Sequence, residues 1–200
     1  MPTAIVTGGT SGLGAAIAQR LTGYDVITVS RRESATVRGD ASREDTARRA
    51  IAAAPTPITL LVNCAGSGLF GPAGSNKEED VRRTIDANLT ATIVFCEALF
   101  DHFKQNGGTI VNVLSTAALF SRANESVYSA AKWGARGYTE VLKAEAKGTK
   151  ARVMSVAPGG MQTPFWDAPR EGFMDPGAVA DAIVDALDRP VNVTELVIQR

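Results

Sequence analysis

Residues 3–14 read TAIVTGGTSGLG: a short apolar run passes directly into a glycine-rich segment that contains Gly8, Gly12 and Gly14. A run that is apolar throughout, rather than alternating, is typical of a strand buried on both faces of a sheet. The glycines let the backbone turn sharply, approach an anion closely and point the free N–H groups of the next helix at it. The stretch therefore predicts a strand, a pyrophosphate-binding turn and a helix. Because the spacing is GxxxGxG and not GxGxxG, a glycine turn without a ligand remains the alternative.

The alternation of apolar runs and helical segments continues to the end of the chain. Such alternation requires crossover connections, which make the strands parallel. We therefore expect a doubly wound α/β sandwich of the Rossmann type, with up to seven parallel strands, as a single domain over residues 1–200. Ser42 with Asp45 is expected at a helix start, and Gly107 after a helix end. Further strands are predicted at 25–30, 36–38 (the weakest), 60–63, 109–115, 152–156 and 195–198, and helices at 12–22, 42–54, 77–105, 126–147 and 175–188.

The composition excludes several classes of protein. The 21 basic and 21 acidic residues balance, so no overall field recruits nucleic acid or an anionic membrane surface. No stretch approaches the roughly 18 uninterrupted apolar residues of a membrane span, and the first residues do not resemble a secretory signal. The isolated Cys64 and Cys96 suggest a reducing compartment, so we expect a cytoplasmic protein without a disulfide. With His102 as the sole histidine, we expect no metal site.

The residues that follow the second strand indicate which dinucleotide the chain would bind. In a doubly wound sheet, ligands bind outside the carboxyl ends of the strands. Here Ser30, Arg31 and Arg32 offer a hydroxyl and two guanidiniums, which suit the additional phosphate of NADP. NAD is less favoured, because it usually pairs with an acidic side chain at this point. Alternatively, both arginines lie on a solvated loop and pair with Glu33 or other surface carboxylates.

Three later turns could also contact a dinucleotide. Asp40 could accept a hydrogen bond from an adenine amino group, or it could be an ordinary turn residue. The small residues of NCAG, at 63–66, would let the backbone approach a ligand, although alone they indicate only a turn. Thr163 follows the turn at Pro158 and Gly159 and could bond a carboxamide, or this stretch could simply connect a strand to a helix.

Ser115, Tyr128 and Lys132 form the candidate catalytic set. In a helix, Tyr128 and Lys132 leave the same face one turn apart. A free phenol has a pKa of about 10, and we expect the nearby ammonium to lower it toward neutral pH. The hydroxyl of Ser115 could hold a substrate oxygen beside the phenol. A hydrolase triad is not indicated, because the single histidine has no suitable acid and LST lacks the glycines of a nucleophile elbow.

Taken in order, these residues resemble the short-chain dehydrogenase/reductase family over the whole chain. The resemblance rests on the glycine motif at Thr7, Gly8, Gly12 and Gly14, the NCAG segment, Asn88, Ser115 thirteen residues before Tyr128, Lys132, and the Pro158–Gly159 turn with Thr163. It implies hydride transfer between NADP(H) and a carbonyl/alcohol pair. In that scheme Tyr128 is the general acid/base, Ser115 positions the substrate oxygen, Lys132 tunes Tyr128 and binds the nicotinamide ribose, and Asn88 holds a water.

The resemblance also implies a set of cofactor-binding residues. Some positions depart from the family pattern: Cys64 replaces an asparagine, Leu114 replaces a common serine, and the chain is short for the family. About sixteen residues separate Gly159 from the last helix, so the substrate lid is expected to be short. The implied cofactor contacts are Gly8, Thr10, Ser11, Gly12, Leu13, Gly14, Ser30, Arg31, Arg32, Asp40, Ala41, Asn63, Ala65, Gly66, Asn88, Tyr128, Lys132, Pro158, Gly159, Met161 and Thr163.

Two functional hypotheses follow. The first is reduction of a small apolar ketone or aldehyde in a pocket lined by Ala117, Leu119, Met161, Phe165 and Trp166, although these residues could equally be core or oligomer contacts. The second is an NADP(H)-binding, redox-sensing protein with little turnover, which retention of Ser115, Tyr128 and Lys132 weighs against. The apolar helix at 77–105 also suggests a homo-oligomer, either a dimer or a tetramer.

Overall fold

Seven parallel strands form one sheet in the computed structural model, which describes residues 1–168 and 170–200. The strand order is β3-β2-β1-β4-β5-β6-β7, so the order reverses between β1 and β4. This confirms the expected doubly wound sheet and places its ligand crevice at the carboxyl ends of β1 and β4. The strands are β1 (Thr3–Thr7), β2 (Asp25–Ser30), β3 (Val37–Arg38), β4 (Ile58–Asn63), β5 (Gly108–Val113), β6 (Ala151–Pro158) and β7 (Glu195–Ile198).

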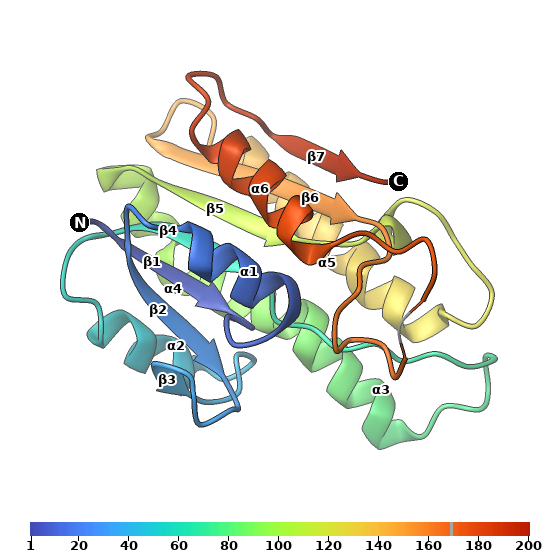
Figure 1. Cartoon of the computed structure of the whole chain (residues 1–200). Coiled ribbons are helices and arrows are strands. Elements are labelled where there is room, and N and C mark those ends of the chain that lie inside the picture. Colours follow the sequence, from blue (N-terminus) through green and yellow to red (C-terminus); the bar gives the residue numbers. More distant parts are fainter. Residues whose placement is uncertain (169) are drawn as a thin grey trace.

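Helices cover both faces of the sheet (Figure 1). One face packs against α1 (Gly12–Arg20) and α6 (Pro176–Leu187), and the other against α2 (Glu44–Ala52), α4 (Ala91–Asn106) and α5 (Ser126–Glu145). Neighbouring residues of one strand therefore enter different cores: Ile5 packs on the α4 side, whereas Val6 packs on the α1 side. This explains why the strands are apolar throughout rather than alternating.

The helix expected over 77–105 is continuous but not uniform. It consists of α3 (Glu78–Ile85), a π-helical turn (Asp86–Thr90) and α4. The wider turn contains Asn88, whose side chain is buried. Such turns are frequent at functional sites, so this irregularity marks the position of a predicted site residue.

Local signals at two helix ends had different outcomes. Gly107 ends α4 with a φ of 92°, as its sequence position indicated. The expected cap at Ser42 was wrong: α2 begins at Glu44, and the Ser42 hydroxyl instead donates to Oδ1 of Asp40 at 2.9 Å. A side chain that satisfies a nearby turn in this way is not free to cap the helix. Among the described helices, none is long and apolar enough to cross a membrane.

Candidate active site

A cleft of about 1200 Å³ opens at the carboxyl ends of the strands. The glycine-rich turn after β1 lies along it, together with the residues after β2 and the start of α5. These segments are far apart in the sequence and meet because all the strands run in the same direction. Every residue proposed from the sequence as catalytic or cofactor-binding lines this cleft, with the exception of Asn63.

The glycine-rich turn has the geometry of an anion cradle. Gly8 and Gly12 have φ values of 68° and 52°, which side-chain-bearing residues rarely adopt. A Cβ on Gly14 would lie 2.4 Å from the carbonyl oxygen of Gly8, so this close packing requires glycine. The N-cap residue of α1, Ser11, makes no side-chain capping bond, which leaves N–H groups of the first turn directed at the cleft. The turn therefore fits a pyrophosphate.

The arginines after β2 have no carboxylate partner within the described part of the chain. Arg31 and Arg32 are exposed at the cleft, and no ion pair among the described residues includes either of them. Glu33, the partner considered for them, pairs with Arg38 at 3.4 Å. The hydroxyl of Ser30 accepts hydrogen bonds from Thr10 at 2.8 Å and from the N–H of Arg32 at 3.0 Å. Ser30 thus ties the glycine turn to the arginine segment.

The side chain of Asp40 belongs to a turn while still lining the cleft. Its Oδ1 accepts hydrogen bonds from the N–H and the hydroxyl of Ser42, both at 2.9 Å. Oδ1 of Asp40 therefore serves a turn, and the hydrogen bond from an adenine amino group stays a prediction.

Asn63 is buried inside the sheet and does not line the cleft. Its Nδ2 donates to Oδ1 of Asn112 at 2.9 Å, which connects β4 to β5. The next two residues, Cys64 and Ala65, do line the cleft. Their N–H groups both bond the hydroxyl of Thr7 at 3.1 Å, which ties this turn to the end of β1. The amide of Asn63 therefore serves the sheet, and the cofactor contact expected of this segment stays a prediction for Ala65 and Gly66, which line the cleft.

Ser115, Tyr128 and Lys132 meet on one wall of the cleft. The ammonium of Lys132 donates to the carbonyl of Val113 at 3.0 Å and lies 6.0 Å from the centre of the Tyr128 ring. Ser115 caps the 3-10 turn Thr116–Ala118, and its hydroxyl accepts from the N–H of Ala117 at 3.1 Å. Both Tyr128 and Lys132 are buried.

Burial dominates the titration of this pair. It raises the pKa of Tyr128 to about 12, although a hydrogen bond from Ser115 acts in the opposite direction. Burial also lowers the pKa of Lys132 to about 8. The expected lowering of the phenol pKa by Lys132 is therefore wrong for the polypeptide alone. The low-dielectric surroundings disfavour both charged forms, and the ammonium hydrogen-bonds a backbone carbonyl.

Two hydrogen bonds fix the side chain of Asn88, and its amide oxygen accepts none from the described residues. Its Nδ2 donates to the carbonyls of Ser67 at 2.7 Å and Thr84 at 2.9 Å. Its Oδ1 is buried and has no hydrogen-bond partner among the described residues. A Cβ on Gly66 would lie 2.7 Å from this oxygen and 3.8 Å from the Lys132 ammonium, so the glycine leaves open space between the two groups.

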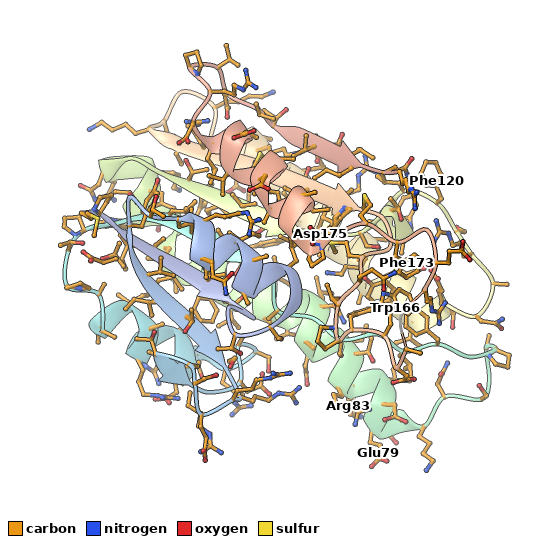
Figure 2. The ribbon with its side chains drawn as sticks, in the orientation of Figure 1. Glu79, Arg83, Phe120, Trp166, Phe173 and Asp175 are labelled. Carbon is orange, nitrogen blue, oxygen red and sulfur yellow. The ribbon has the colours of Figure 1, made fainter. Side chains whose placement is uncertain are left out.

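Aromatic side chains close the end of the cleft next to Tyr128. Ala117, Met161, Phe165 and Trp166 line it as expected, whereas Leu119 does not. Sequence reasoning missed Phe70, Arg170 and Phe173, which line it as well. Phe70 lies in the loop after β4, so its position at a carboxyl strand end was the available signal. Trp166 and Phe173 pack together with ring centres 5.3 Å apart (Figure 2).

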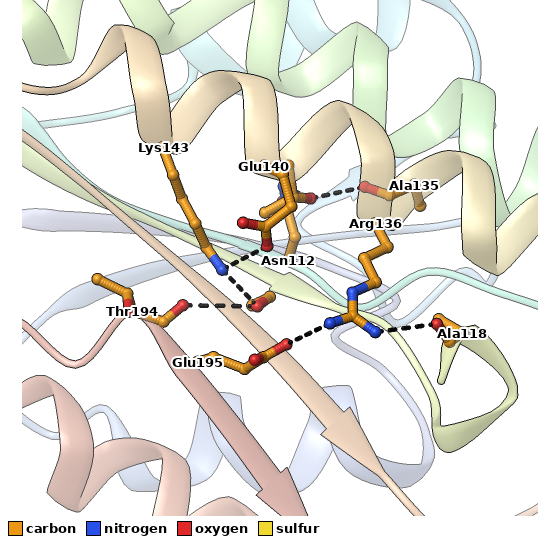
Figure 3. A network of polar contacts seen from close by, with 10 residues as sticks. Asn112, Ala118, Ala135, Arg136, Glu140, Lys143, Thr194 and Glu195 are labelled. Atoms are coloured by element: carbon orange, nitrogen blue, oxygen red, sulfur yellow. Dashed lines mark hydrogen bonds and ion pairs between the residues drawn. The ribbon is translucent and has the colours of Figure 1, made fainter. Parts of the chain in front are cut away.

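A polar network supports the turn that carries Ser115 (Figure 3). On α5, Arg136 donates to the carbonyl of Ala118 at 3.2 Å and pairs with Glu195 of β7 at 3.4 Å. About two turns further along, Lys143 bonds the hydroxyl of Ser155 at 2.8 Å and Glu140 at 2.7 Å. The last strand and α5 thereby brace the turn after β5.

The described residues contain no group of three or more His, Cys, Asp or Glu side chains placed to bind a metal. His102 is exposed on α4, where its ring contacts Asn106. Cys64 and Cys96 are free thiols.

Comparison with known proteins yields consistent similarities. A family model described as short chain dehydrogenase matches residues 31–172. A sepiapterin reductase from Chlorobaculum tepidum is 34% identical over 149 residues, which are 72% of this chain and 61% of that protein. An uncharacterized oxidoreductase from Staphylococcus epidermidis is 29% identical over 98% of this chain and 96% of its own length. A Burkholderia cenocepacia short chain dehydrogenase, solved in complex with NADP, superimposes with a TM-score of 0.89 at 28% identity, covering 100% of this chain and 88% of that one.

Proposed function

The chain belongs to the short-chain dehydrogenase/reductase family of oxidoreductases, and we propose that it transfers a hydride between NADP(H) and a carbonyl/alcohol pair. The observation that carries this proposal is the meeting of Ser115, Tyr128 and Lys132 with the glycine turn in one cleft. The aromatic end of the cleft favours a small apolar ketone or aldehyde as the substrate.

The residues near β1 and β2 would hold the cofactor. The free N–H groups at the start of α1 suit the pyrophosphate, and Arg31 and Arg32 suit the additional phosphate of NADP. The NADP bound to the Burkholderia relative supports the same choice. When bound, the nicotinamide supplies or accepts the hydride.

Tyr128 would move the proton of the substrate oxygen. With its pKa raised to about 12, the phenol is protonated at neutral pH and is ready to act as the acid in reduction. The Ser115 hydroxyl can donate to the same oxygen and stabilise its developing charge. Because the pKa of Lys132 is about 8, the ammonium is mostly charged at neutral pH. Proton loss from Tyr128 in the reverse direction would also need the positive charge that an oxidised nicotinamide supplies when bound.

Asn88 would complete a path for the proton. Its unpaired Oδ1 faces the space beside Gly66, which the Lys132 ammonium also borders. A buried carbonyl oxygen without a donor is costly, and a water placed there would satisfy it. Such a water would connect Lys132 to solvent and resupply the proton that Tyr128 gives up.

Substitution of Tyr128 by Phe tests the proposal. We expect Tyr128→Phe to lower kcat for NADPH-dependent carbonyl reduction by at least about a hundredfold, because the acid is lost. NADPH affinity should stay nearly unchanged, as measured by fluorescence titration.

The matched control is Tyr138→Phe on the same helix. The hydroxyl of Tyr138 bonds Glu97 at 2.6 Å, away from the cleft, so this variant should keep its turnover. Undiminished turnover in Tyr128→Phe would refute the acid/base assignment. Tight NADPH binding by the unaltered protein, without turnover on a broad panel of apolar carbonyls, would refute the enzymatic proposal itself.

We also propose that the chain forms a homo-oligomer through α4 and α5. Trp133 and Val141 lie exposed on α5, with 48% and 55% of their surfaces accessible. Large apolar side chains on one helix are suited to burial against a second copy.

A further inference from the structure

Phe70 occupies a position beside the proposed proton donor without belonging to the core. Its ring centre lies 5.8 Å from that of Tyr128 and 4.9 Å from that of Trp166. The rings of Phe70 and Trp166 are close to parallel, with an interplanar angle of 19°. Yet 41% of Phe70 is exposed, so much of this ring faces solvent although it contacts the phenol.

Trp166 is held in place by groups other than Phe70. Phe165 and Phe173 contact its ring at 5.1 Å and 5.3 Å, both in edge-to-face geometry. The guanidinium of Arg170 lies over the ring at 4.3 Å. The backbone of Arg170 is in turn bonded to the side chain of Gln162. If Phe70 moved away, these contacts would still hold Trp166 and would leave open the face on which Phe70 now stacks.

The segment that carries Phe70 is an irregular, glycine-rich loop. It lies between β4 and α3, has no regular secondary structure and contains Gly68, Gly71 and Gly74. A Cβ on Gly68 would lie 2.4 Å from the Phe70 ring, so the ring reaches its present place only because that residue is glycine. Near Phe70, the backbone is tied across the cleft by the bond from the N–H of Gly71 to the carbonyl of Asn124, at 2.8 Å.

We propose that Phe70 marks a stacking subsite for a planar ring of the substrate. The ring of the substrate takes the place of Phe70 on Trp166, and its adjacent carbonyl meets Tyr128 and Ser115. The preferred substrates are therefore aryl carbonyl compounds rather than saturated ones of the same size. The inference rests on the proposed function, because it assumes that the carbonyl reacts at Tyr128. Parallel stacking on Trp166 should favour the flat ring by about two- to tenfold in affinity.

A binding experiment separates this inference from the proposed activity. Trp133 and Trp166 are the two tryptophans of the chain, so the Trp133→Phe background makes Trp166 the single indole reporter. With NADP+ present, benzamide is compared with cyclohexanecarboxamide, a pair of unreactive carbonyl compounds that differ in ring planarity. We expect benzamide to quench Trp166 fluorescence and to bind about two- to tenfold more tightly than its saturated counterpart.

Inhibition of turnover by the same pair extends the test to variants. Trp166→Leu should abolish the preference, Trp166→Phe should restore part of it, and Phe70→Ala should retain it while lowering both inhibition constants. Phe120→Ala is the matched control, because Phe120 is 55% exposed and does not line the cleft.

Equal constants for the two amides, or a preference that survives in Trp166→Leu, would overturn the subsite and leave the reductase proposal intact. Selective quenching by benzamide in a protein that reduces no carbonyl would support the subsite and remove the reductase proposal.

Discussion

Lys132 carries a charge that the fold disfavours, and this has a consequence for stability. Burial lowers the pKa of its ammonium from 10.5 to about 8. Between these values the unfolded chain binds a proton that the folded chain has released, so the free energy of unfolding rises with pH. Below about pH 8 the cost of the buried charge is present in full. The buried Lys132 ammonium therefore lowers the free energy of unfolding, and the proposed site keeps its cation at this cost.

We predict that Lys132→Met stabilises the protein at pH 7 while abolishing its activity. The gain should be on the order of 3 kcal/mol, from a shift of between two and three pKa units. Urea unfolding of both proteins at several pH values measures it. The difference in free energy of unfolding between variant and parent should narrow as the pH rises from 8 to 10. A difference that does not depend on pH would show that burial does not lower the pKa of Lys132.

A second prediction at the level of single side chains concerns the choice of cofactor. Arg31→Ala should lower the affinity for NADPH by about ten- to a hundredfold, because a charge-assisted hydrogen bond to phosphate is lost. The affinity for NADH should change little. Dissociation constants from fluorescence titration provide the comparison. The control is Arg38→Ala, which removes an exposed arginine already paired with Glu33. Equal losses for both cofactors would contradict the assignment of Arg31.

The proposed site residues Ser115 and Asn88 both lie where one secondary-structure element passes into the next. The hydroxyl of Ser115 is fixed where β5 passes into a 3-10 turn, and Asn88 where α3 passes into α4 through a π-helical turn. The turn at Ser115 is also braced from outside by Arg136 and Glu195 (Figure 3). Strand β7 therefore contributes to the site although none of its residues lines the cleft.

This bracing predicts a kinetic effect without a loss of cofactor binding. Arg136→Gln and Glu195→Gln should each lower kcat by about two- to tenfold. Each variant removes roughly one hydrogen bond that holds the turn at Ser115, so the hydroxyl is positioned less well. The KM for NADPH should not change. Glu140→Gln is the control, since it disrupts the pair with Lys143 on the same helix without touching the turn. A change confined to KM for NADPH would contradict a role through Ser115.

At the scale of the whole molecule, the doubly wound sheet and its two cores create one cleft from segments that are distant in sequence. The chain closes the substrate end with short connections. Met161 and Met174 are joined by an isolated β-bridge, and Phe165 and Trp166 contact Phe70. That the segment after Gly159 forms a short lid over the substrate stays a prediction from the sequence.

The proposed oligomer is tested at this same scale. We predict a dimer or a tetramer by light scattering, and dissociation in Trp133→Glu, which places a charge on the exposed apolar face of α5. Phe120→Glu is the control, because it adds the same charge at another exposed aromatic residue, outside α5. A monomeric parent protein at micromolar concentration would exclude the oligomer.

The sequence by itself determined the strands, the glycine turn and the parallel direction of the strands. It also named a set of candidate site residues, nearly all of which line the cleft. These features follow from local patterns: unbroken apolar runs, backbone freedom at Gly8, Gly12 and Gly14, and helical spacing between Tyr128 and Lys132. Each pattern is set by interactions among residues close together in the chain. Parallel strands then bring their carboxyl ends to one edge, so the position of the site followed from the fold class.

Only the tertiary structure decided what depends on burial and on partners from other elements. It placed the amide of Asn63 against Asn112 inside the sheet, and it brought Phe70 beside Tyr128 and Trp166. It also reversed the expected direction of the Tyr128 pKa, because desolvation outweighs the hydrogen bond from Ser115. The Lys132 ammonium, meanwhile, donates to the Val113 carbonyl. Spacing along a helix specifies which side chains are neighbours, but the dielectric around them is created by the segments that pack over them.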